Sequence, residues 1–361
     1  MKLLRLSPRV TSTSAPYNQF SLGFKKTIDQ ILCSFLRHDV LIDENIKVFH
    51  GNGSIVKMLK IIKELVKKNK FDVIHIHSGL MGVIFILAIF PSRLGLLKKT
   101  VFTLHNSWHV IKTRNQILNF FVMLLSRKVC TCGLSSRDSI PKSINYFIGG
   151  KTEPIVNGFD HNRIDRVEKN KGKSNHFQKF SKIKILYVGA LNKTKNQMAL
   201  LEVLKIINIE AELIFLGDGV NKKTLIEYSK NITNSTKISF KGLVSRDLAI
   251  EHMIEADVCI SLSKGEGLPI AVLEAMYAGC FMILSTIPPH LEVSPPSDRC
   301  FFVDISNKDE IIESLNYVMN NLKKNRIGRE KSKEYAISKF GVGNMLDGYK
   351  KVYKSICQDE N

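Results

Sequence analysis

The sequence predicts an α/β protein with two αβα domains, each organised around a parallel sheet. Three observations lead to this prediction. The chain has 361 residues, which corresponds to about two domains of ordinary size. Short apolar runs alternate with longer helical patterns along nearly the whole chain, as β-α-β units require. A charged stretch with few large apolar residues, 161–182, separates two such series and is typical of a linker.

In the first half of the chain, short apolar runs predict strands and the longer periodic segments predict the helices between them. The predicted strands are 2–6, 46–49, 73–77, 100–104 and 128–131. The predicted helices are 20–36, 54–70, 80–90 and 110–125. Strands joined through helices run in the same direction, so this order predicts a parallel sheet.

The second half repeats the alternation. Its predicted strands are 183–188, 212–216, 237–240, 258–262 and 281–284. Its predicted helices are 197–207, 221–230, 247–255 and 269–277, with further helical patterns at 308–324 and 343–356. We therefore divide the chain into an N-terminal domain, 1–165, a linker, 166–182, a C-terminal domain, 183–340, and a C-terminal helix, 341–361, that could return to the first domain.

The chain is strongly basic. It has 53 Lys and Arg residues against 33 Asp and Glu residues, a formal net charge of +20. Such a surface attracts phosphates, whether in nucleic acid, on an anionic membrane or in phosphorylated small molecules. Composition alone does not choose among these partners.

Cysteine usage and the N-terminus bear on the compartment. The seven cysteines are scattered without a C-x-x-C pair, which favours a reduced chain over a disulfide framework or a zinc site. The N-terminus, MKLLRLSPRV, lacks the apolar run of a signal peptide. The longest apolar stretch, 79–90, is too short to span a bilayer and is typical of a buried helix. We therefore expect a cytoplasmic protein.

Two glycine-containing turns follow predicted strands. In open α/β sheets, ligands bind at the carboxyl ends of the strands, and two facing domains predict a site in the cleft between them. Gly189 begins a turn that carries Lys193 and Lys195 into a helix, an arrangement that favours an anion such as a phosphate. Gly217 and Gly219 form a second turn of this kind. The alternative is a tight turn and a loop with two solvated lysines.

The segment 263–276 holds the densest signal. A predicted strand ends, a glycine-rich turn carries Glu266, and Pro269 stands where a helix would begin. The free N–H groups at that helix start can hold phosphate oxygens. Glu274 follows Glu266 by eight positions, about two helical turns, so both carboxylates could face one ligand. The alternative is an acid in the first turn and an unrelated exposed helix Glu.

This segment resembles the E-x7-E signature of retaining glycosyltransferase family 4, which has the GT-B fold of two Rossmann-like αβα domains facing across a cleft. The resemblance extends over roughly residues 70 to 290. Five further motifs appear in the family's order: D-V-I-H-I-H at 72–77, T-L-H at 103–105, N-G-F-D at 157–160, the turn 189–196 and G-D-G at 217–219.

The resemblance implies roles for individual residues. The catalytic residues would be His105 and Glu266, both near the transferred sugar. Glu274 would bind the ribose, and Lys195 would hold the diphosphate with the backbone of Gly267 and Leu268. The full donor-binding set is Gly189, Lys193, Lys195, Gly217, Gly219, Gly267, Leu268 and Glu274. On the acceptor side we place Ser14, His77, Asn106 and Trp108.

The chain departs from the family's pattern in two places. Ala190 stands where the family has Arg, so one diphosphate cation is missing, and Lys193 could replace it. The glycine pair usual after the first strand is absent, and the loop 10–16 takes its place.

A GT-B enzyme without a metal must stabilise the departing diphosphate with lysines and helix-start N–H groups. No D-x-D occurs in the chain, which counts against the metal-dependent alternative fold. His75 and His77 share a strand face and could suggest a metal pair, but the family's pattern already accounts for them. We expect no metal and no cofactor, because the nucleotide-sugar is a substrate. The family retains anomeric configuration, through front-face attack assisted by the leaving phosphate.

The helix predicted over 54–70 has a basic stripe, and an apolar stripe lies opposite. The basic stripe is Lys60, Lys63, Lys67 and Lys70, and the apolar stripe is Ile55, Leu59, Ile62 and Val66. The basic stripe could bind the anionic inner face of the plasma membrane, with the apolar segment 120–125 adding to it. The alternative is a solvated basic face on a core-packed helix.

The sequence therefore predicts a retaining glycosyltransferase that moves a sugar from a UDP- or GDP-sugar to a glycan or lipid-linked acceptor, in O-antigen- or capsule-type polysaccharide biosynthesis. One alternative is a GT-B-like nucleotide-sugar epimerase. The other is a basic nucleic-acid-binding protein, but no RNA-binding motif with interleaved aromatics is visible and we expect no nucleic-acid partner.

Overall fold

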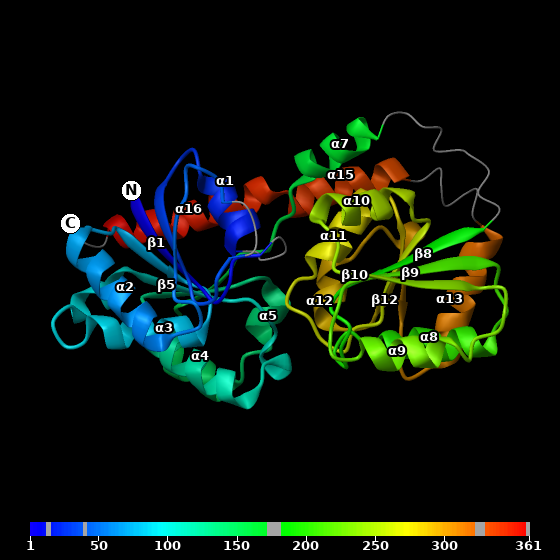
Figure 1. Cartoon of the computed structure of the whole chain (residues 1–361), viewed down its shortest axis with the longest axis horizontal. Helices are drawn as coiled ribbons and strands as arrows, with labels where there is room; N and C mark the ends of the chain where they lie inside the picture. Colours follow the sequence, from blue (N-terminus) through cyan, green and yellow to red (C-terminus); the bar gives the residue numbers. More distant parts are fainter. Residues whose placement is uncertain (12–15, 39–41, 172–181, 322–328, 359–361) are drawn as a thin grey trace. The chain divides into compact units, whose positions relative to one another are not determined.

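The computed structural model describes residues 1–11, 16–38, 42–171, 182–321 and 329–358, and the chain forms two compact units (Figure 1). Unit 1 comprises Met1–Gly158 and Val342–Asn361, and unit 2 comprises Phe159–Gly341. The C-terminal segment therefore belongs to the same unit as the N-terminus. The boundaries differ from the expected 165 and 340, because the chain leaves unit 1 directly after Gly158.

Unit 1 contains a parallel sheet with the strand order β3-β2-β1-β4-β5-β6-β7. The strands are β1 (Lys2–Ser7), β2 (Asp29–Ser34), β3 (Lys47–His50), β4 (Val73–Ile76), β5 (Thr100–Leu104), β6 (Lys128–Thr131) and β7 (Thr152–Pro154). The chain order reverses between β1 and β4, which makes this pair the point where a doubly wound sheet binds ligands.

Helices cover both faces of this sheet. One face packs against α2 (Ile55–Lys68), α3 (Gly79–Ile89), α4 (Thr113–Leu125) and α6 (Lys142–Ile148). The other packs against α1 (Leu22–Phe24) and α16 (Val342–Gln358). Shorter elements are η1 (Pro16–Ser21), η2 (Leu94–Lys99), η3 (Trp108–Val110) and α5 (Leu134–Asp138). Leu4 of β1 faces the first layer and Leu3 the second, as the strand period of two requires.

The helix expected over 20–36 is wrong. This segment holds the end of η1, the short helix α1 and the buried strand β2. β2 pairs with β1 on one side and β3 on the other, so Ile31 and Leu32 are buried on both faces of the sheet. The mixed apolar and polar pattern of 20–36 does not by itself separate a helix from a strand, and pairing between distant segments decides the outcome.

Unit 2 contains a second parallel sheet, with the strand order β10-β9-β8-β11-β12-β13. The strands are β8 (Ile183–Val188), β9 (Ala211–Leu216), β10 (Lys237–Gly242), β11 (Val258–Ser261), β12 (Phe281–Ser285) and β13 (Cys300–Val303). On one face lie α8 (Gln197–Ile206), α9 (Lys222–Ser229) and α13 (Lys308–Asn320), and on the other α7 (His161–Asn170), α10 (Arg246–Glu255), α11 (Ile270–Tyr277) and α15 (Arg329–Phe340) (Figure 1). The remaining short helices are α12 (Pro288–Val293) and η4 (Ser297–Arg299). Here the order reverses between β8 and β11.

The first part of the expected linker is helical. α7 begins after Asp160, whose side chain accepts a hydrogen bond from the backbone of Arg163, and it buries Ile164 and Val167 against α10. These two apolar residues are three positions apart and share one helix face, which indicates a helix. The many charged residues around them favoured the interpretation as a linker. Residues 172–181 of the expected linker lie outside the described residues.

The apolar stretch 79–90 is a buried helix, as expected. Seven residues of α3 are buried between α2 and α4. Within the described parts of the chain, every helix is too short or too polar to span a bilayer. Six of the seven cysteines are buried, as is usual for cysteines that pack as small apolar residues.

The close approach of α3 to α4 depends on Gly79. A methyl group at this position would lie 2.7 Å from the backbone nitrogen of Asn119. We expect Gly79→Ala to lower the free energy of unfolding by about 1–3 kcal/mol, because backbone atoms must move to admit the methyl group. The measurement is urea unfolding followed by the fluorescence of Trp108, which is buried in the same unit. Gly95→Ala is the matched control, since nothing lies within 4 Å of its added carbon; equal stability of the two variants would contradict the packing role.

Candidate active site

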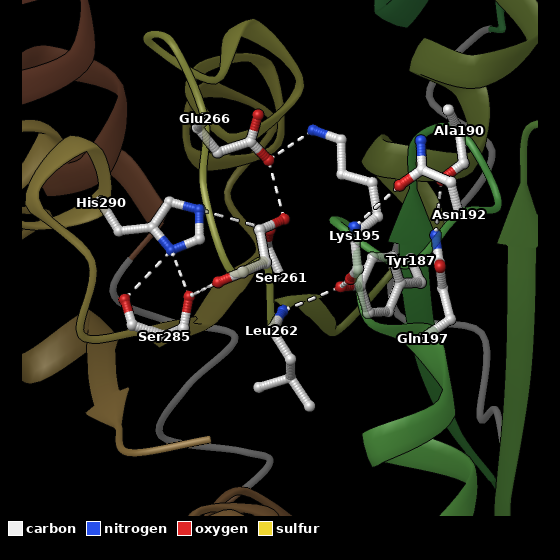
Figure 2. Close-up of polar contacts among 11 residues, drawn as sticks. Tyr187, Ala190, Asn192, Lys195, Gln197, Ser261, Leu262, Glu266, Ser285 and His290 are labelled. Atoms are coloured by element: carbon white, nitrogen blue, oxygen red, sulfur yellow. Dashed lines mark hydrogen bonds and ion pairs between the residues drawn. The ribbon is translucent and has the colours of Figure 1, made fainter. Parts of the chain in front are cut away.

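An ion pair crosses the point where the strand order of unit 2 reverses. Lys195, in the loop after β8, contacts the carboxylate of Glu266, in the loop after β11 (Figure 2). The same carboxylate oxygen accepts a hydrogen bond from the hydroxyl of Ser263 at 2.7 Å. The Glu266 side chain is 10% exposed and that of Lys195 is 23% exposed, so the acid is nearly buried and the lysine is partly accessible at the carboxyl edge of the sheet. The structure thus brings together two residues that the sequence analysis assigns to one site.

The loop that carries Lys195 is held at both ends. Tyr187 of β8 donates a hydrogen bond from its hydroxyl to the carbonyl of Lys195, and the same hydroxyl accepts one from the backbone N–H of Leu262 at 2.9 Å. The side chain of Asn192 accepts from the backbone N–H of Lys195 at 2.9 Å. Gln197 donates to the carbonyl of Ala190 at 3.0 Å (Figure 2). The ammonium group is therefore presented by a fixed backbone.

The glycines of the two turns have a packing role. Gly217 has a φ of +136°, and a methyl group on it would lie 2.0 Å from the carbonyl oxygen of Gly189. A methyl group on Gly219 would lie 2.4 Å from the carbonyl oxygen of Leu191. The turns after β8 and β9 are thus in direct backbone contact, and only glycine allows it.

Lys193, two residues before Lys195, is exposed.

The second carboxylate of the signature has its own cation. Glu274 lies on α11 and is buried, and its carboxylate forms an ion pair with Arg246 on α10. Burial raises the pKa of Glu274 from its ordinary value, while Arg246 opposes that shift. Each acid at this edge therefore has a separate basic partner. Arg246 was missed at the sequence level because nothing in its local pattern marks it.

The start of α11 lies between the two acids. The helix begins at Ile270, one residue later than expected, with Pro269 as its N-cap, and Gly267 and Leu268 are buried just before it. The first backbone N–H groups of a helix have no partner within the helix, and they carry the positive end of its dipole. This edge of unit 2 can therefore hold an anion.

A buried histidine supports the loop of Glu266. His290, on α12, lies 3.3 Å from the hydroxyl of Ser261 through Nε2 and 3.1 Å from the carbonyl of Ser285 through Nδ1 (Figure 2). The hydroxyl of Ser261 is 3.2 Å from that of Ser263, which donates to Glu266. Burial lowers the pKa of His290 to about 4. His290 was also missed at the sequence level.

The expected residues of the N-terminal half lie in unit 1 and differ in exposure. His105 is half-buried at the end of β5, and its Nε2 is 2.8 Å from Nδ1 of His77, which is buried. Burial and the nearby Arg5 lower the pKa of His105 to about 4. Asn106 is exposed, whereas Trp108 packs in the core. Ser14 lies outside the described residues.

The basic stripe on α2 is exposed. Its last lysine lies outside the helix, and the apolar stripe on the opposite face contains other residues than expected. Lys60, Lys63 and Lys67 are exposed on the helix, and Lys70 lies two residues beyond its end. The buried face consists of Met58, Ile62, Leu65 and Val66, while Ile55 is 47% exposed.

His75 and His77 make hydrogen bonds to protein groups. Ring nitrogens of these two residues contact Arg5, Thr103 and His105. Over the described ranges of the chain, no group of three or more His, Cys, Asp or Glu side chains is arranged to hold a metal ion.

Comparison with known proteins identifies the class. Residues 167–336, which lie within unit 2 and include Lys195, Glu266 and Glu274, match the family model described as glycosyl transferases group 1. Unit 2 therefore carries a glycosyltransferase group 1 domain, and the chain is a glycosyltransferase with the two Rossmann-like domains of the GT-B fold.

Similar proteins extend the comparison beyond unit 2. The capsular polysaccharide biosynthesis glycosyltransferase CapH of Staphylococcus aureus is 29% identical over 267 residues, which cover 70% of this chain and 68% of CapH. The UDP-Gal:alpha-D-GlcNAc-diphosphoundecaprenol alpha-1,3-galactosyltransferase of Escherichia coli is 25% identical over 338 residues, 86% of this chain and 84% of that enzyme. The solved structure of HepE from Anabaena in complex with UDP and glucose superposes with a TM-score of 0.79 at 16% identity, covering 98% of this chain and all of HepE.

The low pKa of His290 predicts acid sensitivity. Between pH 6.5 and about 4 the unfolded chain takes up a proton that the folded chain does not, so stability falls as the pH falls through this window. Between pH 7.5 and pH 5 this group contributes a loss of about 2 kcal/mol in the free energy of unfolding. Between the same two pH values, the free energy of unfolding of His290→Gln should fall by about 2 kcal/mol less than that of the wild type. The measurement is urea unfolding followed by circular dichroism. His109→Gln, at an exposed position, should behave as the wild type; an undiminished loss in His290→Gln would refute the assignment.

Proposed function

We propose that this enzyme transfers a sugar from a nucleotide-sugar, a UDP-sugar in the first instance and a GDP-sugar as the alternative, to a glycan or lipid-linked acceptor, with retention of configuration. The observation that carries the proposal is the contact of Lys195 with Glu266 beside the start of α11. The E-x7-E spacing adds support, and so do the capsule glycosyltransferase and the galactosyltransferase among the similar proteins. We place the reaction in surface polysaccharide assembly.

Binding of the nucleotide-sugar would replace the contact between Lys195 and Glu266 with new contacts to the donor. In the free enzyme, Lys195 and Glu266 satisfy each other. A bound diphosphate competes for the ammonium group of Lys195, and the N–H groups at the start of α11 supply further donors. Glu266 is then free to accept hydrogen bonds from sugar hydroxyls, while Glu274, held by Arg246, accepts them from the ribose. Lys195 thus exchanges one anion for another, while Glu266 exchanges its cation for hydroxyl donors.

The chemistry places positive charge at the anomeric carbon and negative charge on the diphosphate. Fixed donors aimed at the oxygens that gain charge stabilise this transition state without a metal. We propose front-face attack by the acceptor hydroxyl, with a phosphate oxygen of the leaving group taking its proton. No enzyme nucleophile is required, and no metal or cofactor takes part.

A lipid-linked acceptor would place the enzyme at the inner face of the plasma membrane as a peripheral protein. Three lysines of α2 are exposed on one face, Lys60, Lys63 and Lys67. Each lysine close to an anionic leaflet contributes about 1 kcal/mol of attraction. Exposed apolar side chains on neighbouring helices of the same unit add area, including Leu87 of α3 and Phe121 of α4.

The two lysines of the donor loop should differ in effect. Lys195→Ala should lower kcat by about 10²–10³-fold, because it removes one preorganised donor from the leaving group. Lys193→Ala should raise the donor KM several-fold if this residue replaces the missing arginine. The measurement is release of nucleoside diphosphate together with product analysis, which separates transfer from isomerisation of the donor. Lys230→Ala, an exposed lysine of α9's C-cap, is the control. Wild-type kcat in Lys195→Ala, or loss of transfer in EDTA, would contradict the mechanism.

The membrane proposal predicts a charge-dependent interaction with vesicles. The enzyme should float with phosphatidylglycerol-containing liposomes and less with neutral ones. Replacing Lys60, Lys63 and Lys67 together with Gln should reduce recovery on the anionic vesicles. A triple Gln variant at Lys223, Lys230 and Lys237, exposed positions in unit 2, removes the same charge elsewhere. Equal losses in the two variants would show that net charge alone matters and would overturn the docking face.

A further inference from the structure

We propose that Arg5 is a positioning residue that fixes the tautomers of a row of three histidines, so that His105 presents an N–H donor through Nδ1 at the carboxyl edge of unit 1. The proposal rests on the hydrogen-bond geometry around β1, β4 and β5. It deepens the proposed function, since it specifies what His105 would offer a sugar oxygen that reaches this edge.

Arg5 occupies an unusual position for a cation. It lies on β1 at the reversal point of the sheet, directly opposite His75 of β4, and its side chain is fully buried. Its Nη1 is 3.1 Å from Nδ1 of His75 and 3.1 Å from Nε2 of His77. The guanidinium carbon lies 5.3 Å from the ring centre of Phe20. Its Nε and Nη2 have no hydrogen-bond partner among the described residues.

The direction of each hydrogen bond follows from the chemistry of arginine. A guanidinium group only donates, so Nε2 of His77 must accept. A neutral imidazole has one donor and one acceptor nitrogen, so His77 carries its hydrogen on Nδ1. That hydrogen points to Nε2 of His105 at 2.8 Å, which must then accept. His105 therefore carries its own hydrogen on Nδ1.

A second branch ends at the C-terminal helix. Nδ1 of His75 accepts from Arg5 and lies 2.6 Å from the hydroxyl of Tyr353 on α16, so its hydrogen is on Nε2. Nε2 lies 2.7 Å from the hydroxyl of Thr103, which in turn is 3.1 Å from the hydroxyl of Tyr349. The cation is thus surrounded by neutral groups, and the contacts assign the ring N–H positions of the imidazoles.

The environment keeps the three imidazoles neutral. Burial lowers the pKa of His75 and His77, and the charge of Arg5 acts in the same direction on both and on His105. The titratable and charged groups around His105 are Arg5 of β1, the two histidines of β4, and, beyond Thr103, Tyr349 and Tyr353 of α16. A proton added at Nε2 of His105 would face the N–H of His77. His105 is therefore a neutral donor rather than a general acid or base.

Nitrogen-15 NMR of the full-length enzyme without substrate tests the tautomers directly. The His105 signals are assigned by their loss in His105→Gln. We expect a protonated Nδ1 and an unprotonated Nε2 at pH 7, with no titration of His105 between pH 5 and 8. A hydrogen on Nε2, or titration near pH 6.5, would overturn the proposal. The wild-type spectrum decides this even if an Arg5 variant fails to fold.

Variants of Arg5 supply the second readout. Arg5→Met keeps the side-chain length but removes the donor, so we expect mixed tautomers at His105 and a kcat lowered by about tenfold, the loss of roughly one hydrogen bond. Arg5→Lys should restore part of both. Binding of UDP should be unchanged in all three proteins, because the donor residues lie in unit 2. If His105 has the expected tautomer but the enzyme transfers no sugar, the proposed function is refuted and the tautomer assignment stands. If Arg5→Met keeps the wild-type tautomer at His105, the role of Arg5 is refuted and the proposed function stands.

Discussion

The ion pair between Lys195 and Glu266 is the contact on which the candidate site depends. It joins the loops after β8 and β11, the two strands between which the chain order of unit 2 reverses. Strands of a parallel sheet present their following loops at one edge, and at a reversal point the helices leave that edge in opposite directions. The pair therefore stands where a ligand can approach, and the packed glycines and Tyr187 hold it there.

Unit 1 has the same reversal between β1 and β4, and it too carries a cation there. Arg5 is fully buried among imidazole and phenol groups, whereas Lys195 is partly exposed beside a carboxylate. The difference in partners indicates a difference in use. A partly exposed lysine can exchange its carboxylate partner for a phosphate, while a buried arginine with neutral partners can only orient them. Unit 2 thus supplies a charge at the carboxyl edge of its sheet, and unit 1 supplies a fixed hydrogen-bond donor at the carboxyl edge of its own sheet.

Much of unit 2 could be predicted from the sequence, because its strands and helices have clear periods and its acids lie on a turn and a helix in regular spacing. Prediction failed where distant segments decide the structure. The segment 20–36 becomes strand β2 because β1 and β3 pair with it, and α7 forms because α10 covers Ile164 and Val167. Arg246, His290 and Arg5 were missed for the same reason. Their partners at the site, Glu274, Ser261 and His75, are 28, 29 and 70 residues away, so no local pattern marks these contacts.

A crystal structure of the enzyme with UDP would locate the diphosphate. We expect it at the start of α11 within hydrogen-bonding distance of the Lys195 ammonium group, with that group no longer on Glu266, and the ribose hydroxyls on the Glu274 carboxylate. Density for the nucleotide away from the carboxyl ends of β8 and β11, or a bound diphosphate beside an intact Lys195–Glu266 pair, would contradict this expectation.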